Sequence, residues 1–322
     1  MTWLSFHDFE TEKSTYDGLV QKTPEVDVFC SRAHWVLPAQ RVYAPGVHPF
    51  IWKTDASYCV FMLVRMAPGM LCAMPLEIGW GLACPLIGPD PDRSVGALAA
   101  ALSRASLKPN YVMVTGLIEG GQLSAALDAR FGAQVLREKG EVCIRRVADL
   151  SGGVDQFLSR RSAKFRGELR RKSRQVERLG VQCDFVTTSE ISTLMQRIVA
   201  VESQSWKGLT GQGVDTGLPL QFYESVVSSL IERCAFRCVF IQLDGQDIGF
   251  AFGGIEGTTF RGLQLSFCHE YRGMSPGNYA QLRLIEWLVS QGVTRYDLGM
   301  DMPYKARWAE QTHMTQTRLI AV

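Results

Sequence analysis

A turn of eight residues, Tyr271 to Asn278, most constrains what this chain can fold into. It follows an apolar run typical of a strand, residues 260–267, and opens an amphipathic segment typical of a helix. The first N–H groups of a helix have no partner within the helix, and its dipole adds partial positive charge there. Ser275 is predicted to be the N-cap, with Pro276 in the first helical position. Together these features predict an anion site, for which a diphosphate is the natural ligand.

The composition is typical of a soluble globular protein and limits the kinds of partner. The chain has 322 residues, of which 46% are hydrophobic and 20% charged, so two domains or one large domain are expected. A formal net charge of +2 means that any binding of a polyanion is local. No apolar run is long enough for a membrane span, and the first residues lack the pattern of a secretory signal, which favours a cytoplasmic protein. The nine scattered cysteines include no CxxC pair, so free buried thiols are expected and no metal site.

The order of elements predicts two domains, 1–150 and 151–322, separated at the glycine pair before residue 154. The first 46 residues are expected to be irregular, and residues 134–147 to form a strand or hairpin. The second domain is expected to open with one long helix, residues 154–179. Both halves have the same sequence of strands, helix and closing strands, which favours an α/β (mixed α+β) fold of two tandem domains. The first half has no counterpart of the 271–278 turn.

Four segments of the second half resemble the GNAT (Gcn5-related N-acetyltransferase) superfamily. They are the basic helix at Phe165–Lys172, the Glu-x-x-Ser-Trp-Lys-Gly segment at Glu202–Gly208, the turn Tyr271–Gly277, and Asp297-x-Gly299 followed by Tyr304-Lys305. They cover about residues 155–310. Within the superfamily the chain is similar to the two-domain branch that includes the FemAB aminoacyltransferases and the cellulose-biosynthesis-associated acetyltransferases.

The resemblance implies two tandem GNAT-like domains with mixed, largely antiparallel sheets flanked by helices, the first degenerate. It implies acetyl-CoA or a longer acyl-CoA as co-substrate, and no metal. The implied donor-binding residues are Leu265, Arg272, Gly273, Met274, Ser275, Gly277 and Asn278. The superfamily turn reads Arg/Gln-x-x-Gly-x-Gly/Ala, so here Ser275 stands where the central glycine is expected. An ordinary capped helix start is the alternative interpretation of this turn.

Four residues are candidates for catalysis. Amine acylation requires removal of a proton, and Glu202 or Asp297 could accept it, whereas Lys305 or Tyr304 could stabilise negative charge or protonate the leaving thiolate. The alternatives are structural: a surface carboxylate at position 202, and an ion pair between Asp297 and Lys305. Trp206 and Lys207, beside a glycine-rich loop, are candidates for the acceptor site, and so is His269.

The segment Arg160–Arg178 carries nine Lys/Arg and two Glu. A solvated helix face is one interpretation. The other is a dock for a CoA phosphate, an acyl-carrier protein, an anionic membrane surface or RNA.

These observations predict an acyl-CoA-dependent N-acyltransferase that acts by direct attack. It would be cytoplasmic, with peripheral contact to the inner membrane face as an alternative, and its acceptor an amine on a small molecule, lipid or sugar. Transfer from aminoacyl-tRNA, as in FemAB-type relatives, and a non-catalytic adaptor are the other hypotheses.

Overall fold

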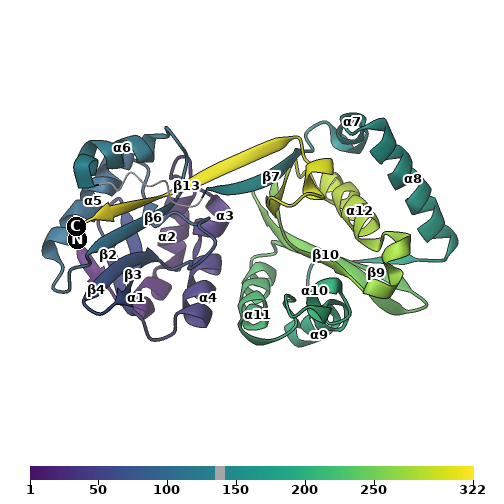
Figure 1. The fold of residues 1–322 in the computed structure, drawn as a ribbon, viewed down its shortest axis with the longest axis horizontal. Helices are drawn as coiled ribbons and strands as arrows, with labels where there is room; N and C mark the ends of the chain where they lie inside the picture. The colour runs from purple at the N-terminus through teal and green to yellow at the C-terminus, as the bar shows by residue number, and fades with distance from the viewer. Residues whose placement is uncertain (135–141) are drawn as a thin grey trace. The chain divides into compact units, whose positions relative to one another are not determined.

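The computed structural model describes residues 1–134 and 142–322, which form two compact units (Figure 1). Unit 1 comprises Met1–Ile144 with Met314–Val322, and unit 2 comprises Arg145–His313. The domain boundary predicted near residue 150 lies close to the point where the chain first passes from unit 1 to unit 2, after Ile144. At the C-terminus the units differ from the predicted domains, since the last strand, β13 (Gln311–Ala321), pairs with β6 of unit 1. The predicted strand at 134–147 ends in β7 (Cys143–Asp149), and its residues 135–141 lie outside the described part of the chain.

Unit 1 contains a mixed sheet in the order β1-β2-β3-β4-β6-β13, with β5 paired to β3. Only the β4–β6 pair is parallel. Its remaining strands are β1 (Thr2–Leu4), β2 (His48–Lys53), β3 (Tyr58–Ala67), β4 (Met70–Pro75), β5 (Leu86–Ile87) and β6 (Tyr111–Leu117). Its helices are α1 (Phe6–Thr11), α2 (Lys13–Val20), α3 (Val28–Ser31), α4 (Ala33–Tyr43), α5 (Pro91–Arg104) and α6 (Gln122–Phe131).

The expectation of an irregular segment over the first 46 residues was wrong, because α1 to α4 lie there. Local capping explains two of these helices. The Ser5 side chain accepts from the N–H of Asp8, whose carboxylate accepts from the N–H of Ser5, which forms a capping box. Asp27 caps α3 through the N–H of Cys30. These signals are short, and the helices they start are only a few residues long.

Unit 2 contains the sheet β7-β12-β11-β10-β9-β8, in which only the β11–β12 pair is parallel. The further strands are β8 (Gln182–Val186), β9 (Phe236–Leu243), β10 (Gln246–Glu256), β11 (Thr259–Phe267) and β12 (Arg295–Met300). The helices are α7 (Gly153–Ser159), α8 (Ala163–Arg178), α9 (Ile191–Glu202), α10 (Trp206–Leu209), α11 (Gly217–Glu232) and α12 (Pro276–Ser290), with 3₁₀ turns η2 (His269–Met274) and η3 (Lys305–Arg307). Figure 1 shows α7, α8 and α12 on one face of this sheet and α9, α10 and α11 on the other.

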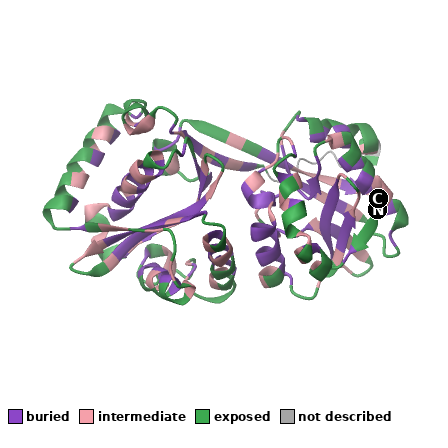
Figure 2. Ribbon diagram, turned by 180° about the vertical axis from the view of Figure 1, so that it is seen from behind, coloured by how far each residue is buried: buried purple, intermediate pink, exposed green. Residues whose placement is uncertain are grey.

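The single helix predicted over residues 154–179 is divided into α7 and α8. The break is local, since the Ser162 side chain accepts from the N–H of Phe165 and starts a new helix. Phe165, Leu169 and Val176 are buried in the core that α8 shares with α12. Figure 2 shows buried residues concentrated in the strands, whereas most of α8 is exposed.

The predicted mixed α/β class with largely antiparallel sheets is therefore confirmed. Among the described residues, none of the helices combines the length and apolar character that crossing a membrane requires.

Candidate functional site

The neighbouring strands β11 and β12 of unit 2 are paired over only part of their length. Their parallel pairing runs from Thr259–Arg295 to Arg261–Asp297, although β11 continues to Phe267 and β12 to Met300. On the other side of β11 the register with β10 shifts, because Phe252 faces Gln264 while Gly253 faces Gly262. One extra residue in β11 at this point is the mark of a β-bulge. Backbone groups of β11 beyond Arg261 are thus not used in pairing with β12, and they can meet a ligand.

Asp297 lies at the last paired position, where it is held by two buried arginines. The Nη1 atoms of Arg145 and Arg261 each donate to its Oδ2 over 2.7 Å, and the N–H of Gly299 donates to Oδ1 over 2.8 Å. The three residues are between 4% and 7% exposed. No ion pair joins Asp297 to Lys305 in the described structure. The carboxylate is thus engaged on both oxygens, which fits an anchor for the two strands better than a free proton acceptor.

Lys305 lies immediately beside this cluster. Gly299 has a φ of 81°, a backbone conformation that favours glycine, and the space beside it is occupied by the Lys305 Nζ atom, 3.6 Å from where a Cβ would be. The Nζ atom donates to the carbonyl of Met300 over 2.9 Å. Burial, and then the positive charge of Arg261, lower the pKa of Lys305 to about 8. An ammonium group with this pKa can give up and regain a proton near neutral pH.

Glu202 is fully buried, not at the surface as the structural interpretation expected. Its Oε1 accepts from the Lys207 Nζ over 3.0 Å and from the N–H of Val214 over 3.2 Å. The same Nζ donates to Gln264 of β11 over 2.9 Å, and the Gln264 amide donates to the Tyr223 hydroxyl over 2.9 Å. Glu202 therefore holds Lys207 against the part of β11 that is not paired with β12. The structure thus brings together two residues that the sequence predicted for the site, Glu202 and Lys207.

The 271–278 turn lies between β11 and α12, as predicted, but the cap differs from the expectation. Ser275 occupies the N-cap position with φ 59° and ψ 50°, which is left-handed, and its side chain makes no capping hydrogen bond. Position 275 is where the superfamily turn has its central glycine, and glycine adopts the left-handed conformation without steric cost. Pro276 is at the helix start as predicted.

Replacing Ser275 with glycine is expected to raise the free energy of unfolding by about 1 kcal/mol, because the left-handed strain is relieved. Thermal unfolding of the two proteins measures this difference. Ser275→Ala is the matched control and brings no gain, because alanine is equally strained there. A Ser275→Gly protein that is less stable than wild type would show that the hydroxyl contributes more than the strain costs.

Gly277 brings the start of α12 close to β11. A Cβ at this position would lie 3.0 Å from the Phe267 ring and 3.2 Å from the side chain of Leu265. Of the predicted donor set, Leu265, Ser275 and Gly277 therefore lie together at the open stretch of β11. Arg272 and Gly273 are exposed, and Met274 and Asn278 are partly buried in the same turn. Lys172 of α8 donates to the carbonyl of Gly273, so the basic helix touches the turn.

The other predicted residues lie on the surface. Trp206 is 45% and Tyr304 is 43% exposed. His269 is exposed at the start of η2, where its N–H donates to the carbonyl of Gln204 over 2.8 Å. Tyr304 precedes Lys305, Trp206 precedes Lys207, and the charge of Lys207 acts on Lys305. The two aromatic side chains accordingly belong to the segments that carry the two lysines.

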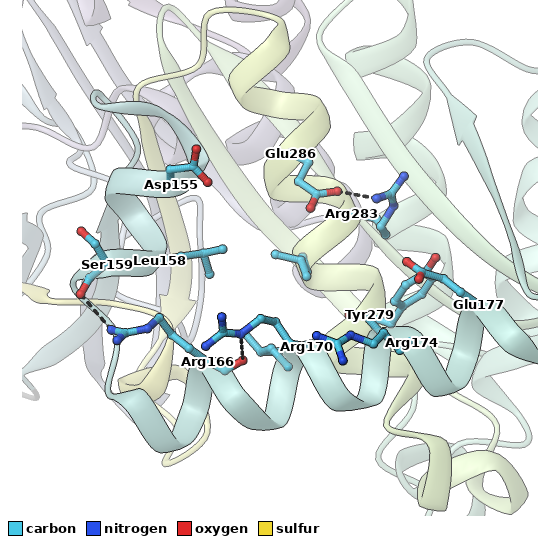
Figure 3. A pocket seen from close by; sticks show the side chains of 13 residues that line it. Asp155, Leu158, Ser159, Arg166, Arg170, Arg174, Glu177, Tyr279, Arg283 and Glu286 are labelled. Atoms are coloured by element: carbon cyan, nitrogen blue, oxygen red, sulfur yellow. Dashed lines mark hydrogen bonds and ion pairs between the residues drawn. The ribbon is translucent and has the colours of Figure 1, made fainter.

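A separate cavity of about 590 Å³ lies between α7, α8 and α12. Figure 3 shows Arg166, Arg170 and Arg174 along one wall and Arg283 with Glu286 on α12. Asp155 and Glu177 also line it, so the cavity has mixed charge.

Sequence reasoning missed four residues of this site: Arg145, Arg261, Gln264 and Tyr223. A signal existed for Arg261, which follows Phe260 within a mainly apolar strand run, whereas Arg145 is paired in sequence with the more exposed Arg146. A charge in such a run is buried only if it is paired. Nothing local marks Gln264 or Tyr223, since Gln264 gains its role by accepting from Lys207 of α10, and Tyr223 by accepting from Gln264.

Comparisons with known proteins bear on the fold that carries this site. Residues 163–306 match the family model described as an acetyltransferase (GNAT) domain, a span close to the predicted one. No curated protein matches the sequence. The crystal structure of FemX superposes with a TM-score of 0.68 at 10% identity, covering 96% of each chain. A conserved protein of unknown function from Bacteroides thetaiotaomicron gives 0.65 at 10% identity, covering 96% of this chain and 97% of its own.

The structure of L-PGS from Bacillus licheniformis is a further match, with a TM-score of 0.57 at 12% identity over 95% of this chain and 90% of the other. At such identities these likenesses show the fold. They confirm the predicted resemblance to the two-domain FemAB-like branch at that level. Residues 163–306 thus match the GNAT domain family, and the two-unit fold of the chain is similar to that of FemX.

Proposed function

We propose that the protein is an acyl-CoA-dependent N-acyltransferase. The observation that carries this proposal is that the pairing of β11 with β12 ends beside both the α12 N-terminus and Lys305. A thioester laid along the open edge of β11 can accept backbone hydrogen bonds near Leu265, while its diphosphate meets the first N–H groups of α12. The similarity to an acetyltransferase (GNAT) domain supports acyl transfer as the class of reaction. The acyl-CoA donor and the amine acceptor are proposed.

The transfer needs no covalent enzyme intermediate. The amine nitrogen attacks the thioester carbonyl carbon, the C–N bond forms, and the C–S bond breaks. Protonated Lys305 donates its proton to the leaving thiolate and regains one from the nitrogen of the attacking amine, so the products are the amide and free thiol. Burial raises the pKa of the Cys238 and Cys268 thiols, which disfavours the thiolate form that a cysteine nucleophile requires.

Calorimetric titration with acetyl-CoA and palmitoyl-CoA tests the donor. Micromolar binding of one of them is expected, and Arg272→Glu is expected to weaken it at least tenfold, because a cation beside the diphosphate becomes an anion. Arg272 is exposed and donates only to the carbonyl of His269, over 3.3 Å, so its reversal leaves the fold intact. Arg104→Glu, an exposed reversal in unit 1, is the control. Absence of heat with both ligands would remove CoA as the donor.

Aminoacyl-tRNA is the second candidate donor, and the basic surface of α8 is the observation in its favour. It predicts salt-sensitive RNA binding together with little affinity for free CoA. The same titrations, repeated with unfractionated tRNA at two salt concentrations, separate the two donors.

A further inference from the structure

The solvent side of α8 is rich in arginine. At 100° per residue, Phe165, Leu169 and Val176 mark the buried side of the helix. The positions opposite include Gly167, Arg170, Arg171, Arg174 and Arg178, all exposed, and these five residues are called the arginine face. The whole helix carries seven Lys/Arg and two Glu, whereas the chain has a formal net charge of only +2. The excess positive charge of the protein is thus concentrated on one helix.

Ion pairs do not neutralise this face. Glu168 pairs with Arg307, on the flank of the helix. Glu177 is exposed and lines the cavity beside Arg170 and Arg174, but it forms no ion pair with them among the described residues. Arg170 donates only to the carbonyl of Arg166, over 3.4 Å, and within the described residues none of the four arginines of the face forms an ion pair. Like charges at i and i+4 repel one another on a helix. The arrangement therefore costs stability in the isolated protein and is relieved by an anionic partner.

Gly167 is a second, independent feature of the arginine face. Glycine is the least favourable residue in a helix interior apart from proline. A Cβ at position 167 would meet nothing within 4 Å, so packing does not require the glycine. The glycine lies in a shallow hollow of about 630 Å³ that the four arginines line together with Gln175 and Leu179. Such a notch lets a partner approach the helix backbone closely.

Helix α8 also touches the proposed donor turn. Lys172, close to the buried side of α8, donates to the carbonyl of Gly273 in that turn, so the arginine face lies on the outer side of the helix that contacts the turn. Arg170, Arg174 and Arg178 follow at intervals of four residues, about 6 Å apart, and span about 12 Å. One CoA molecule, with its diphosphate in the turn, has a single further phosphate and cannot satisfy such a row. A helix with Asp or Glu in successive turns has the same spacing and can pair with each arginine in the row.

We propose that the arginine face docks an acidic carrier protein that presents the acyl group on a phosphopantetheine arm. This inference rests on the proposed function, since it supplies the same thioester to the same turn from a protein instead of from CoA. An RNA strand fits less well because the face exposes no aromatic side chain for base stacking. A planar membrane surface fits less well because it cannot enter the Gly167 notch, and Leu179 is the single apolar residue beside it.

Titration with a phosphopantetheine-bearing acyl carrier protein tests the proposal. Arg171→Glu/Arg174→Glu is expected to weaken binding of the carrier at least tenfold and to leave the affinity for acetyl-CoA within twofold of wild type. Arg104→Glu/Arg130→Glu, the same charge change on α5 and α6, is the control and changes neither. Gly167→Leu is expected to weaken carrier binding as well, while the melting temperature rises by about 2–3 °C because the helix interior improves.

Each other outcome overturns the docking proposal or supports it. Equal carrier affinity in wild type and both α8 variants overturns it, as does absence of carrier binding. Tighter binding of tRNA, or of vesicles of equal phosphatidylglycerol and phosphatidylcholine, that is lost in the same variants replaces the carrier by that partner. Carrier binding without any acetyl-CoA binding keeps the docking surface and rejects free CoA as the donor. Acetyl-CoA binding without carrier binding keeps the proposed function and rejects the surface.

Discussion

Lys305→Met is expected to lower kcat by about 10²–10³-fold, the usual loss when one preorganised donor to a developing negative charge is removed. The Lys305 Nζ atom lies beside the open end of β12, 2.9 Å from the Met300 carbonyl, and replacing it leaves the leaving thiolate without a proton donor. Thiol release from acyl-CoA, measured with an amine acceptor found by screening, gives the rate. Binding of acyl-CoA is expected to change little, because the diphosphate contacts the turn and not Lys305.

The pH dependence of kcat distinguishes an acid from a base at this position. Burial, and secondly the charge of Arg261, lower the pKa of Lys305 from 10.5 to about 8. The protonated form dominates below that pH, so an acid role makes kcat fall as the pH rises through about 8. Lys305→Arg stays protonated throughout and is expected to abolish the falling limb while keeping part of the rate. A wild-type rate that increases through pH 8 would mean that neutral Lys305 acts as a base.

Asp297→Asn is expected to lower the free energy of unfolding of unit 2 by about 3–5 kcal/mol, because the change removes the buried negative charge to which two buried arginines donate. Arg145 and Arg261 are 5% and 4% exposed, so water cannot replace the lost carboxylate. Urea unfolding, followed by the fluorescence of the tryptophans in unit 2, measures the difference.

Asp301→Asn provides the matched control four residues further along the chain. Asp301 pairs with Arg146 at 2.6 Å, but its side chain is 37% exposed, and pairs of that kind contribute about 0–1 kcal/mol. If both variants lose the same small amount of stability, the buried arginine pair does not depend on Asp297 in the way inferred.

The burial of Glu202 and Asp297 also changes how a non-catalytic adaptor can be recognised. A non-catalytic adaptor does not need Glu202 or Asp297 for chemistry, but both carboxylates hold structure together, so Glu202→Gln and Asp297→Asn disturb the fold of an adaptor as well. Lys305→Met is the better discriminator, because Lys305 forms no ion pair in the described structure. An adaptor keeps its function in that variant, whereas the proposed enzyme loses its rate.

Local sequence alone predicted the features that depend on neighbouring residues. The turn at 271–278, the start of α12 at Pro276 and the glycine after Asp297 are set by backbone preferences within a few residues, and all three lie where expected. The same local reasoning held only in part at Ser275, which is the N-cap as predicted but is left-handed and makes no capping hydrogen bond with its side chain. The superfamily pattern, which has glycine there, held the correct signal.

Only the tertiary structure decided which distant side chains meet. Arg145 reaches Asp297 across 152 positions of sequence, and Lys207 reaches Gln264 across 57. Both contacts depend on strand order, register and the bulge in β11, and a shift of one residue would turn these side chains to the opposite face of the sheet. The residue types in the sequence determined that a carboxylate, two lysines and an anion turn were available to the site. The pairing of strands determined that Asp297 anchors the sheet while Lys305 is placed beside its open edge.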